Sequence, residues 1–371
     1  MAARLYTYAF LEDFIVLYPV YALLFADTGL SPGEISSLFA IWSVTGFALE
    51  IPSGVWADVF SRRRLLVAAP LLTGSGYALW TFLPSYPAFA LGFVLWGAGS
   101  ALRSGTLQAL VYEELDRLGA SGSYARLIGR STALGTTAFM AASAVAGPVL
   151  SFGGYRAAGM ASVLACLLCA AAGLTFPESR GRGREDRARY LDVLRDGLAE
   201  VRRSVPVRRA LLLISVVSGL GSLDEYVPLL AQSTGVATPA VPLLVLLVSA
   251  GMTAGGWAAG RAPRALAPVL AAGALCLAAG AAVRRPEGFV LVAAAFGVVH
   301  WAVAGIEARL QDRIADGSRA TVTSMAGLGA EVVALSVYAG YGAGSAWAPP
   351  WLIFSVTAVP YLLTAVAARR V

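Results

Sequence analysis

Lysine and asparagine are absent from this 371-residue sequence, which has one histidine and three cysteines. Without lysine there is no G-x-x-x-x-G-K-[ST] loop to bind the phosphates of ATP. The histidine and the cysteines form no H-E-x-x-H motif and no clustered ligand set for a metal. Cys166 and Cys169 form a C-x-x-C pair among Ala and Leu, so we interpret them as small interior side chains. We therefore expect no metal, no cofactor and no direct use of ATP.

Charged residues are also scarce, at 13% of the chain, whereas 58% of the chain is hydrophobic and the mean hydropathy is +0.70. Soluble globular proteins carry about 25% charged residues. A soluble core of this size could not bury so much apolar surface, so most of that surface must face lipid. The composition excludes a secreted protein, a cytoplasmic enzyme and a protein with a single anchor. It indicates an integral membrane protein with many spans.

Apolar runs separated by turn or charge signals divide the chain into twelve candidate membrane-spanning helices. A span requires about 20 apolar residues, so the chain has room for about a dozen with short connections. The predicted spans are 6–26, 35–57, 64–84, 87–111, 124–150, 155–176, 207–231, 238–260, 265–283, 287–308, 320–344 and 348–368. The sequence therefore predicts an all-α integral membrane fold.

All 28 basic residues are arginine, and their distribution predicts the orientation of the chain. Basic residues near span ends favour the cytoplasmic side. With a cytoplasmic N-terminus, only Arg156, Arg284 and Arg285 fall in outer loops, and 24 arginines lie on the inner side. We therefore expect a multi-pass protein of the cytoplasmic (plasma) membrane with both termini in the cytoplasm. The net charge of +6 then reflects contact with anionic lipid rather than with nucleic acid.

The middle of the chain holds its one long polar stretch, from Pro177 to Arg209. We interpret 177–206 as a cytoplasmic central linker between two six-helix halves, 1–176 and 207–371. A shift of 206 residues supports this division, because it aligns a loop and a glycine-ended span of each half. The aligned segments are Thr28-Gly29 with Thr234-Gly235, and 41–54 with 247–260.

Residues 54–66 read GVWADVFSRRRLL and lie between the second and third predicted spans, on the inner side. This segment resembles the signature loop of the major facilitator superfamily, G-x-L-A-D-x-x-G-R-[RK]-x-x-L. It departs from the pattern at Trp56, where leucine is usual, and at Ser61, where glycine is usual. The resemblance implies a fold of twelve transmembrane helices in two six-helix pseudo-repeats. It also implies a secondary transporter that works by alternating access, with a small molecule, protons and the lipid bilayer as its partners, and we expect a monomer.

The signature loop predicts an ionic latch at the cytoplasmic surface. Gly54 allows two helices to approach closely, and Asp58 can accept from a helix N-terminus. Arg62, beside Arg63, can pair with an acid at the inner end of the fourth span. The available acids are Glu113, Glu114 and Asp116. Such a latch would hold the halves together in one state of the transport cycle, whereas the plainer interpretation is a basic loop that only sets the topology.

Ionisable residues inside the spans are costly and are therefore candidate functional sites. Arg103 lies within the fourth span, where members of the superfamily often carry an arginine implicated in proton coupling; the alternatives are snorkelling to the headgroups or pairing with Glu50. Acid pairs occur in the first and seventh spans. Neighbouring residues in a helix point about 100° apart, so at most one acid of each pair readily faces a cavity. The pairs are Glu12-Asp13 and Asp224-Glu225.

Three further residues complete the candidate set for proton coupling or substrate binding. His300 and Glu307 lie seven residues apart in the tenth span, on one face but about 10 Å apart along the helix, so they form no dyad. Glu331 is an isolated acid in the eleventh span. A lone histidine in a span can titrate near neutral pH, but a hydrogen-bonded packing role explains it equally well.

Aromatic residues of the spans offer a surface on which an aromatic substrate could stack, although helix packing is the more ordinary role of such residues. They are Trp42, Trp80, Trp96, Trp301, Tyr18 and Tyr21. The sequence Gly147-Pro148 followed by Gly153-Gly154 resembles part of an antiporter motif ending in G-P-x-x-G-G, with a spacing two residues longer.

These features favour proton-coupled efflux of a hydrophobic or amphipathic drug or metabolite. The alternatives are a nutrient uptake permease and a membrane sensor or assembly protein without transport activity. Sugar porters usually place more amide side chains in the membrane than this chain, which has three glutamines. The scattered acids form no compact catalytic set, so we do not expect an enzyme.

Overall fold

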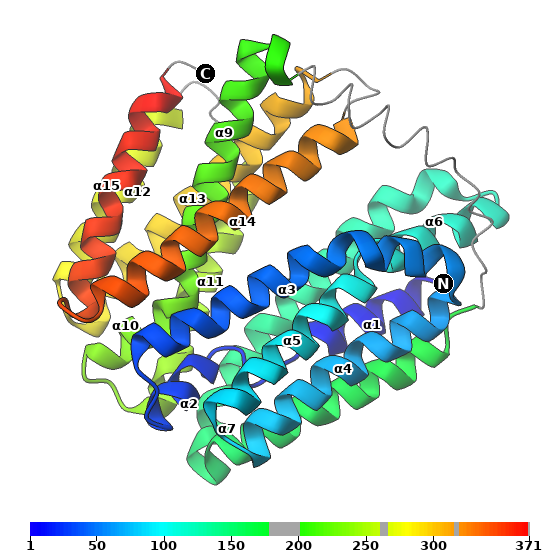
Figure 1. The fold of residues 1–371 in the computed structure, drawn as a ribbon, viewed down its shortest axis with the longest axis horizontal. Coiled ribbons are helices and arrows are strands. Elements are labelled where there is room, and N and C mark those ends of the chain that lie inside the picture. The colour runs from blue at the N-terminus through cyan, green and yellow to red at the C-terminus, as the bar shows by residue number, and fades with distance from the viewer. Residues whose placement is uncertain (178–200, 260–265, 315–318, 370–371) are drawn as a thin grey trace. The chain divides into compact units, whose positions relative to one another are not determined.

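The computed structural model describes residues 1–177, 201–259, 266–314 and 319–369, and it describes the side chains of these except residues 51, 54, 55, 57–59 and 319–321. Within these ranges every regular element is a helix, which confirms the predicted all-α fold (Figure 1). The chain divides into two compact units. Unit 1 is Met1–Gly183 with Thr238–Leu243, and unit 2 is Arg184–Ala237 with Leu244–Val371. The predicted central linker lies largely outside the described ranges, and its limits stay a prediction.

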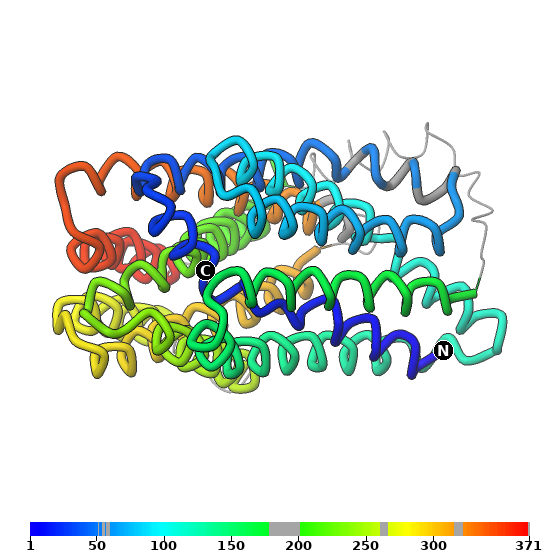
Figure 2. Tube along the Cα trace, turned by 90° about the horizontal axis from the view of Figure 1, so that it is seen from below, coloured from blue at the N-terminus to red at the C-terminus, as the bar shows by residue number. Residues whose placement is uncertain are grey.

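The long helices of unit 1 run roughly along one direction in both views (Figures 1 and 2). The helix α4 packs against α5 and α7, while α1 packs against α7 and α3 against α5. The helix α7 contains non-helical backbone at Gly153 and Gly154, so it consists of two successive helices. The helices are α1 (Ala2–Asp13), α2 (Tyr21–Asp27), α3 (Pro32–Val59), α4 (Arg62–Phe82), α5 (Tyr86–Arg103), α6 (Thr106–Arg117) and α7 (Tyr124–Leu174).

Local signals explain where two of these helices begin. Ser31 and Glu34 form a capping box in which each side chain satisfies a backbone N–H at the start of α3. Ser61 stands where the signature loop usually has glycine. Its hydroxyl accepts a hydrogen bond of 3.4 Å from the backbone N–H of Arg64, so this departure caps the first turn of α4.

In unit 2, α12 packs against α13 and α15, and α9 packs against α13 and α14. These contacts join helices that are distant in the sequence into one bundle. The helices are α9 (Val205–Leu220), α10 (Val227–Ser233), α11 (Val241–Trp257, from Leu244 on), α12 (Leu266–Ala282), α13 (Phe289–Gln311), α14 (Arg319–Gly344) and α15 (Pro350–Ala368).

Each predicted span falls on one or two of these helices. In the described part, seven segments are long and apolar enough to cross a membrane, and one of them, Ser121–Leu174, includes both helices of α7. Other predicted spans are divided between two shorter helices. The fourth span, for example, is divided into α5 and α6, because Ser104 leaves the helical conformation and Gly105 adopts φ +68.

The first span, predicted as a continuous α-helix, is interrupted by non-helical residues, whereas the α-helix of the seventh is interrupted only by a 3-10 stretch within one helical segment, Val205–Ser233. The first leaves the helix between α1 and α2, over residues 14–20, and the seventh continues from α9 into the 3-10 segment Gly221–Tyr226 before α10 begins. Adding the 206-residue offset of the sequence repeat to 14–20 gives 220–226, so the two interruptions coincide. Pro19 and Pro228 lack the N–H that a continuous helix would use near these positions.

The interruption in unit 1 has its polar backbone satisfied inside the protein. The N–H of Leu17 donates a hydrogen bond of 3.0 Å to the hydroxyl of Ser162, which is fully buried in α7. Non-helical backbone at membrane depth requires such partners, since lipid offers none. The serine therefore helps α7 to hold the interrupted span in place.

Candidate functional site

An ion pair lies beside the interruption in unit 1. Glu12, in the last turn of α1, pairs through Oε1 with Nε of Arg103, the last residue of α5. The side chain of Glu12 is 23% exposed and that of Arg103 is 40% exposed. The guanidinium pairs with this acid rather than with Glu50, the acid considered from the sequence. Glu50 instead accepts a hydrogen bond of 3.4 Å from the hydroxyl of Ser104.

Asp13 differs from its neighbour. Its half-buried carboxylate forms no hydrogen bond and no ion pair within the part of the chain that the structure describes, although it interacts electrostatically with Arg103. Oδ2 of Asp13 lies against Gly135 of α7, at a place where a Cβ atom would overlap it. The absence of a side chain at residue 135 thus makes room for this carboxylate.

Four half-buried rings form an aromatic platform next to the same interruption. Tyr18 stacks on Trp96 with centroids 5.3 Å apart, Trp42 lies 5.2 Å from Trp96, and Phe139 lies 5.9 Å from Tyr18. These rings come from the interruption, α3, α5 and α7. Each of them keeps part of its surface exposed. The platform is therefore a group of partly exposed rings near the acids of α1.

The other aromatic candidates have different positions. Trp80 is fully buried and donates a hydrogen bond of 3.1 Å from Nε1 to the carbonyl of Phe89, so it belongs to the core of unit 1. Tyr21 is 5% exposed and lies in the same core. Trp301 belongs to unit 2. The sequence did not distinguish core rings from exposed rings, because both types recur at similar spacing in apolar helices.

The arginine of the signature loop has an acidic partner. NH1 of Arg62, whose side chain is 7% exposed, lies 2.6 Å from Oε1 of Glu113 in α6. Glu114 pairs instead with Arg117, at 2.8 Å. Gly54 and Asp58 belong to α3, but their surroundings lie outside the described part of the structure, and their predicted roles stay predictions. Arg63 is half-buried at the start of α4.

In unit 2, Asp224 and Glu225 lie in the 3-10 segment that interrupts the seventh span, and both are half-buried. Asp224 interacts electrostatically with Tyr361 of α15, and both acids do so with Tyr338 of α14. The next residue, Tyr226, stacks on Tyr341 with ring centroids 3.6 Å apart. Tyrosines of α14 and α15 therefore lie near the acids of the seventh span.

The remaining candidates do not join this group. His300 and Glu307 are exposed on unit 2 and lie seven residues apart on α13. Glu331 is exposed on α14. In unit 1, Gly147 of the partial antiporter motif is buried against the carbonyl of Pro239, at a place where a Cβ atom would overlap that oxygen.

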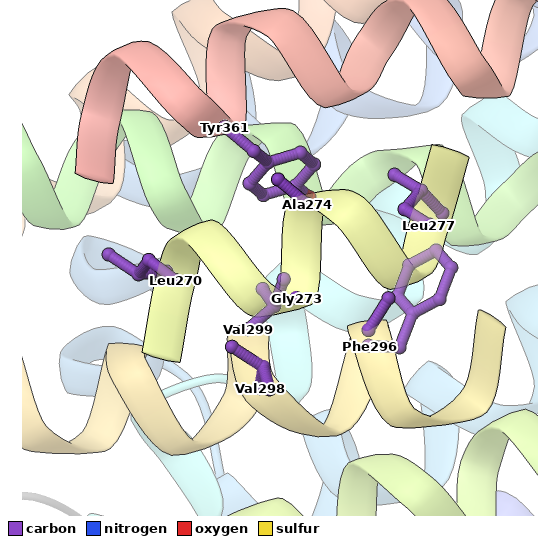
Figure 3. A pocket seen from close by; sticks show the side chains of 9 residues that line it. Leu270, Gly273, Ala274, Leu277, Phe296, Val298, Val299 and Tyr361 are labelled. Atoms are coloured by element: carbon purple, nitrogen blue, oxygen red, sulfur yellow. The ribbon is translucent and has the colours of Figure 1, made fainter. Parts of the chain in front are cut away.

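A small apolar pocket in unit 2 lies between α12, α13 and α15 (Figure 3). Among the residues that line this pocket, only Tyr361 has a polar side-chain group, its hydroxyl. No group of three or more His, Cys, Asp or Glu residues suited to a metal ion occurs in the described ranges.

The sequence model described as "Major Facilitator Superfamily" matches residues 6–337. No curated protein matches the sequence. Three solved structures are similar in fold. They are a mutant of the nucleoside transporter NupG (TM-score 0.80, 12% identical, covering 100% of this chain and 99% of that chain), the POT family transporter PepTSo (0.76, 13%, 100% and 97%) and a D-xylose-proton symporter (0.69, 17%, 99% and 95%). At these identities the similarity establishes the fold alone.

Proposed function

The chain belongs to the major facilitator superfamily of secondary transporters, and on that premise we propose that it couples proton entry to the export of a small hydrophobic or amphipathic molecule. The observation that carries this proposal is that the first and seventh spans leave α-helical geometry at matching positions, through non-helical residues in the first and a 3-10 stretch in the seventh, with acids at both places. Glu12 and Asp13 end α1, and Asp224 and Glu225 lie within the 3-10 segment.

Interrupted helices are suited to this role. Where a helix is broken, backbone and side-chain polar groups can face a ligand at membrane depth, and transporters place substrate and coupling-ion sites at such breaks. Carboxylates there are costly unless they bind a cation or a proton. Export by antiport then requires a carboxylate that releases its proton inside and regains one from outside, and the acids of the seventh span are our candidates for this step.

Proton-coupled uptake is the second candidate, because one structural neighbour is a D-xylose-proton symporter. Two features of this chain favour export. The first is the partial antiporter motif at Gly147-Pro148, and the second is the scarcity of side-chain amides that would bind a polyhydroxylated solute. We further propose that both termini lie in the cytoplasm, as the arginine distribution indicates. We also propose that the chain works as a monomer.

The test begins with a search for the substrate. A pump-deficient host with and without the gene, exposed to a panel of toxic compounds, should show increased resistance to at least one of them. That compound is then supplied to proteoliposomes that contain the purified protein. We expect an imposed pH gradient to drive its accumulation against a concentration gradient, and a protonophore to abolish the accumulation. For export by antiport, the compound should move in the direction opposite to the protons. Movement of the compound in the same direction as the protons would indicate symport, and therefore uptake, and would contradict export.

We also propose that the Arg62–Glu113 pair is the ionic contact that the signature loop predicts. Both residues belong to unit 1, so the pair joins α4 to α6 rather than one half to the other. Replacing Arg62 with glutamate should lower the transport rate at least fivefold, because it places two acids face to face in a buried position. Adding Glu113→Arg should restore a substantial part of the rate by reversing the pair. The matched control is Arg62→Glu with Glu114→Arg, which should give no rescue, since Glu114 pairs with Arg117. Equal rescue by both reversals would contradict a specific pair.

A further inference from the structure

The charges beside the interruption of unit 1 do not cancel. Glu12 is paired with Arg103, whereas Asp13 has no hydrogen bond and no ion pair in the described part of the chain. Two acids and one arginine leave one negative charge at a half-buried position within a membrane span. An unpaired carboxylate there is stabilised when a cation or a proton binds it. One further positive charge would therefore balance the charges of this group.

The aromatic platform lies next to this charge. Asp13 ends α1 and Tyr18 lies five residues later in the interruption, where the two groups interact electrostatically. On α7, Gly135 contacts the carboxylate and Phe139 contacts Tyr18. Residues 135 and 139 are one helical turn, or about 6 Å, apart. Two separate elements thus place the carboxylate and the rings side by side.

Buried rings of the core of unit 1 pack against two rings of the platform. Trp96 stacks on Phe93, which is 1% exposed, with centroids 5.8 Å apart and an interplanar angle of 20°. Tyr18 meets the fully buried Tyr77 edge to face at 6.3 Å. Because the platform rings are supported in this way, a ligand would not need to order them, which lowers the entropic cost of binding.

We propose that Asp13 and the aromatic platform of Tyr18, Trp42, Trp96 and Phe139 form a binding site for an organic cation with a single positive charge and a flat or bulky apolar body. The carboxylate supplies the counter-charge, and the ring faces attract the cation and cover its apolar surface. Anions of the same shape are excluded by Asp13, and Arg103 is unavailable to them because it is paired. This inference rests on the proposed transport function and specifies its substrate class.

The test uses two probes of nearly identical shape and opposite charge, tetraphenylphosphonium and tetraphenylborate. Binding of each to the detergent-solubilised full chain is measured by equilibrium dialysis against protein-free detergent, without any pH gradient. We expect tetraphenylphosphonium to bind at least tenfold more tightly than tetraphenylborate. Asp13→Asn should remove most of this preference by weakening the cation at least tenfold.

Two further variants separate the site from general folding effects. Trp96→Leu should weaken tetraphenylphosphonium binding at least tenfold, whereas Trp96→Phe, which keeps a ring, should retain more of it. Gly135→Ala keeps every charge but places a methyl group against the Asp13 carboxylate, and it should also weaken binding. The matched control is Trp347→Leu, at a tryptophan of unit 2 that is 90% exposed, which should leave binding unchanged.

The outcomes distinguish the two proposals. Equal binding of both probes, or unchanged cation binding by Asp13→Asn together with Trp96→Leu, would overturn the organic-cation site. Cation binding with the expected variant pattern, combined with no effect of a pH gradient on the accumulation of any compound in proteoliposomes, would support the site and contradict the proposed proton coupling.

Discussion

Replacing Arg103 with methionine should destabilise unit 1 and abolish proton-driven transport. The substitution keeps much of the aliphatic length but leaves the Glu12 carboxylate without its partner in a half-buried position. Removing one partner of a buried pair costs several kcal/mol, and the partial exposure of both side chains reduces that cost, so we expect a loss on the order of 2 kcal/mol in the free energy of unfolding. Reversible unfolding in mixed detergent micelles would measure it.

The double variant Arg103→Met with Glu12→Gln tests the cause. If the unpaired charge is responsible, removing it should restore most of the lost stability, because a neutral amide is far less costly at that depth. The matched control is the pair of Arg117 with Glu114 within α6, whose arginine side chain is 59% exposed, and the same two kinds of substitution there should show a coupling of about 0.5 kcal/mol or less. Equal couplings at the two pairs would show that the Arg103–Glu12 contact has no special energetic role.

The sequence predicted the spans well because the signal for them is physical and repeated. Lipid requires about 20 apolar residues and internally satisfied backbone, so runs such as 64–84 and 287–308 coincide closely with α4 and α13. The all-helical fold and the membership of the superfamily follow from the same runs and from residues 54–66. The structure also joins Arg62 to Glu113, one of the three acids considered from the sequence.

The interruptions could not be predicted in the same way. Hydropathy averages over a window and does not detect a few residues that leave the helix, and Pro19 alone gives no length for the break. The partner that stabilises it, Ser162, is 145 residues from Leu17 in the sequence. The choice of Glu12 over Glu50 as the partner of Arg103 also depends on how α1, α3 and α5 pack, which apolar patterns do not specify.

The acids of the seventh span should separate proton coupling from substrate passage. Asp224→Asn or Glu225→Gln should reduce proton-driven accumulation at least tenfold while downhill exchange of the substrate continues, since the path remains and only the proton step is lost. Both measurements use the same proteoliposomes, with and without a pH gradient. Asp312→Asn and Glu287→Gln, at exposed positions of unit 2, are the matched controls and should transport normally.

The same assay distinguishes the roles that we assign to the two interruptions. If Asp13 holds the substrate, Asp13→Asn should reduce downhill exchange and driven accumulation together, whereas the variants at Asp224 and Glu225 should reduce accumulation alone. This contrast follows from the structure, because Asp13 lies beside the aromatic platform and the other two acids lie among tyrosines of unit 2. If both seventh-span variants kept full accumulation, those acids would be structural. The proton step would then have to be sought at Glu307 or Glu331, whose side chains are exposed on α13 and α14.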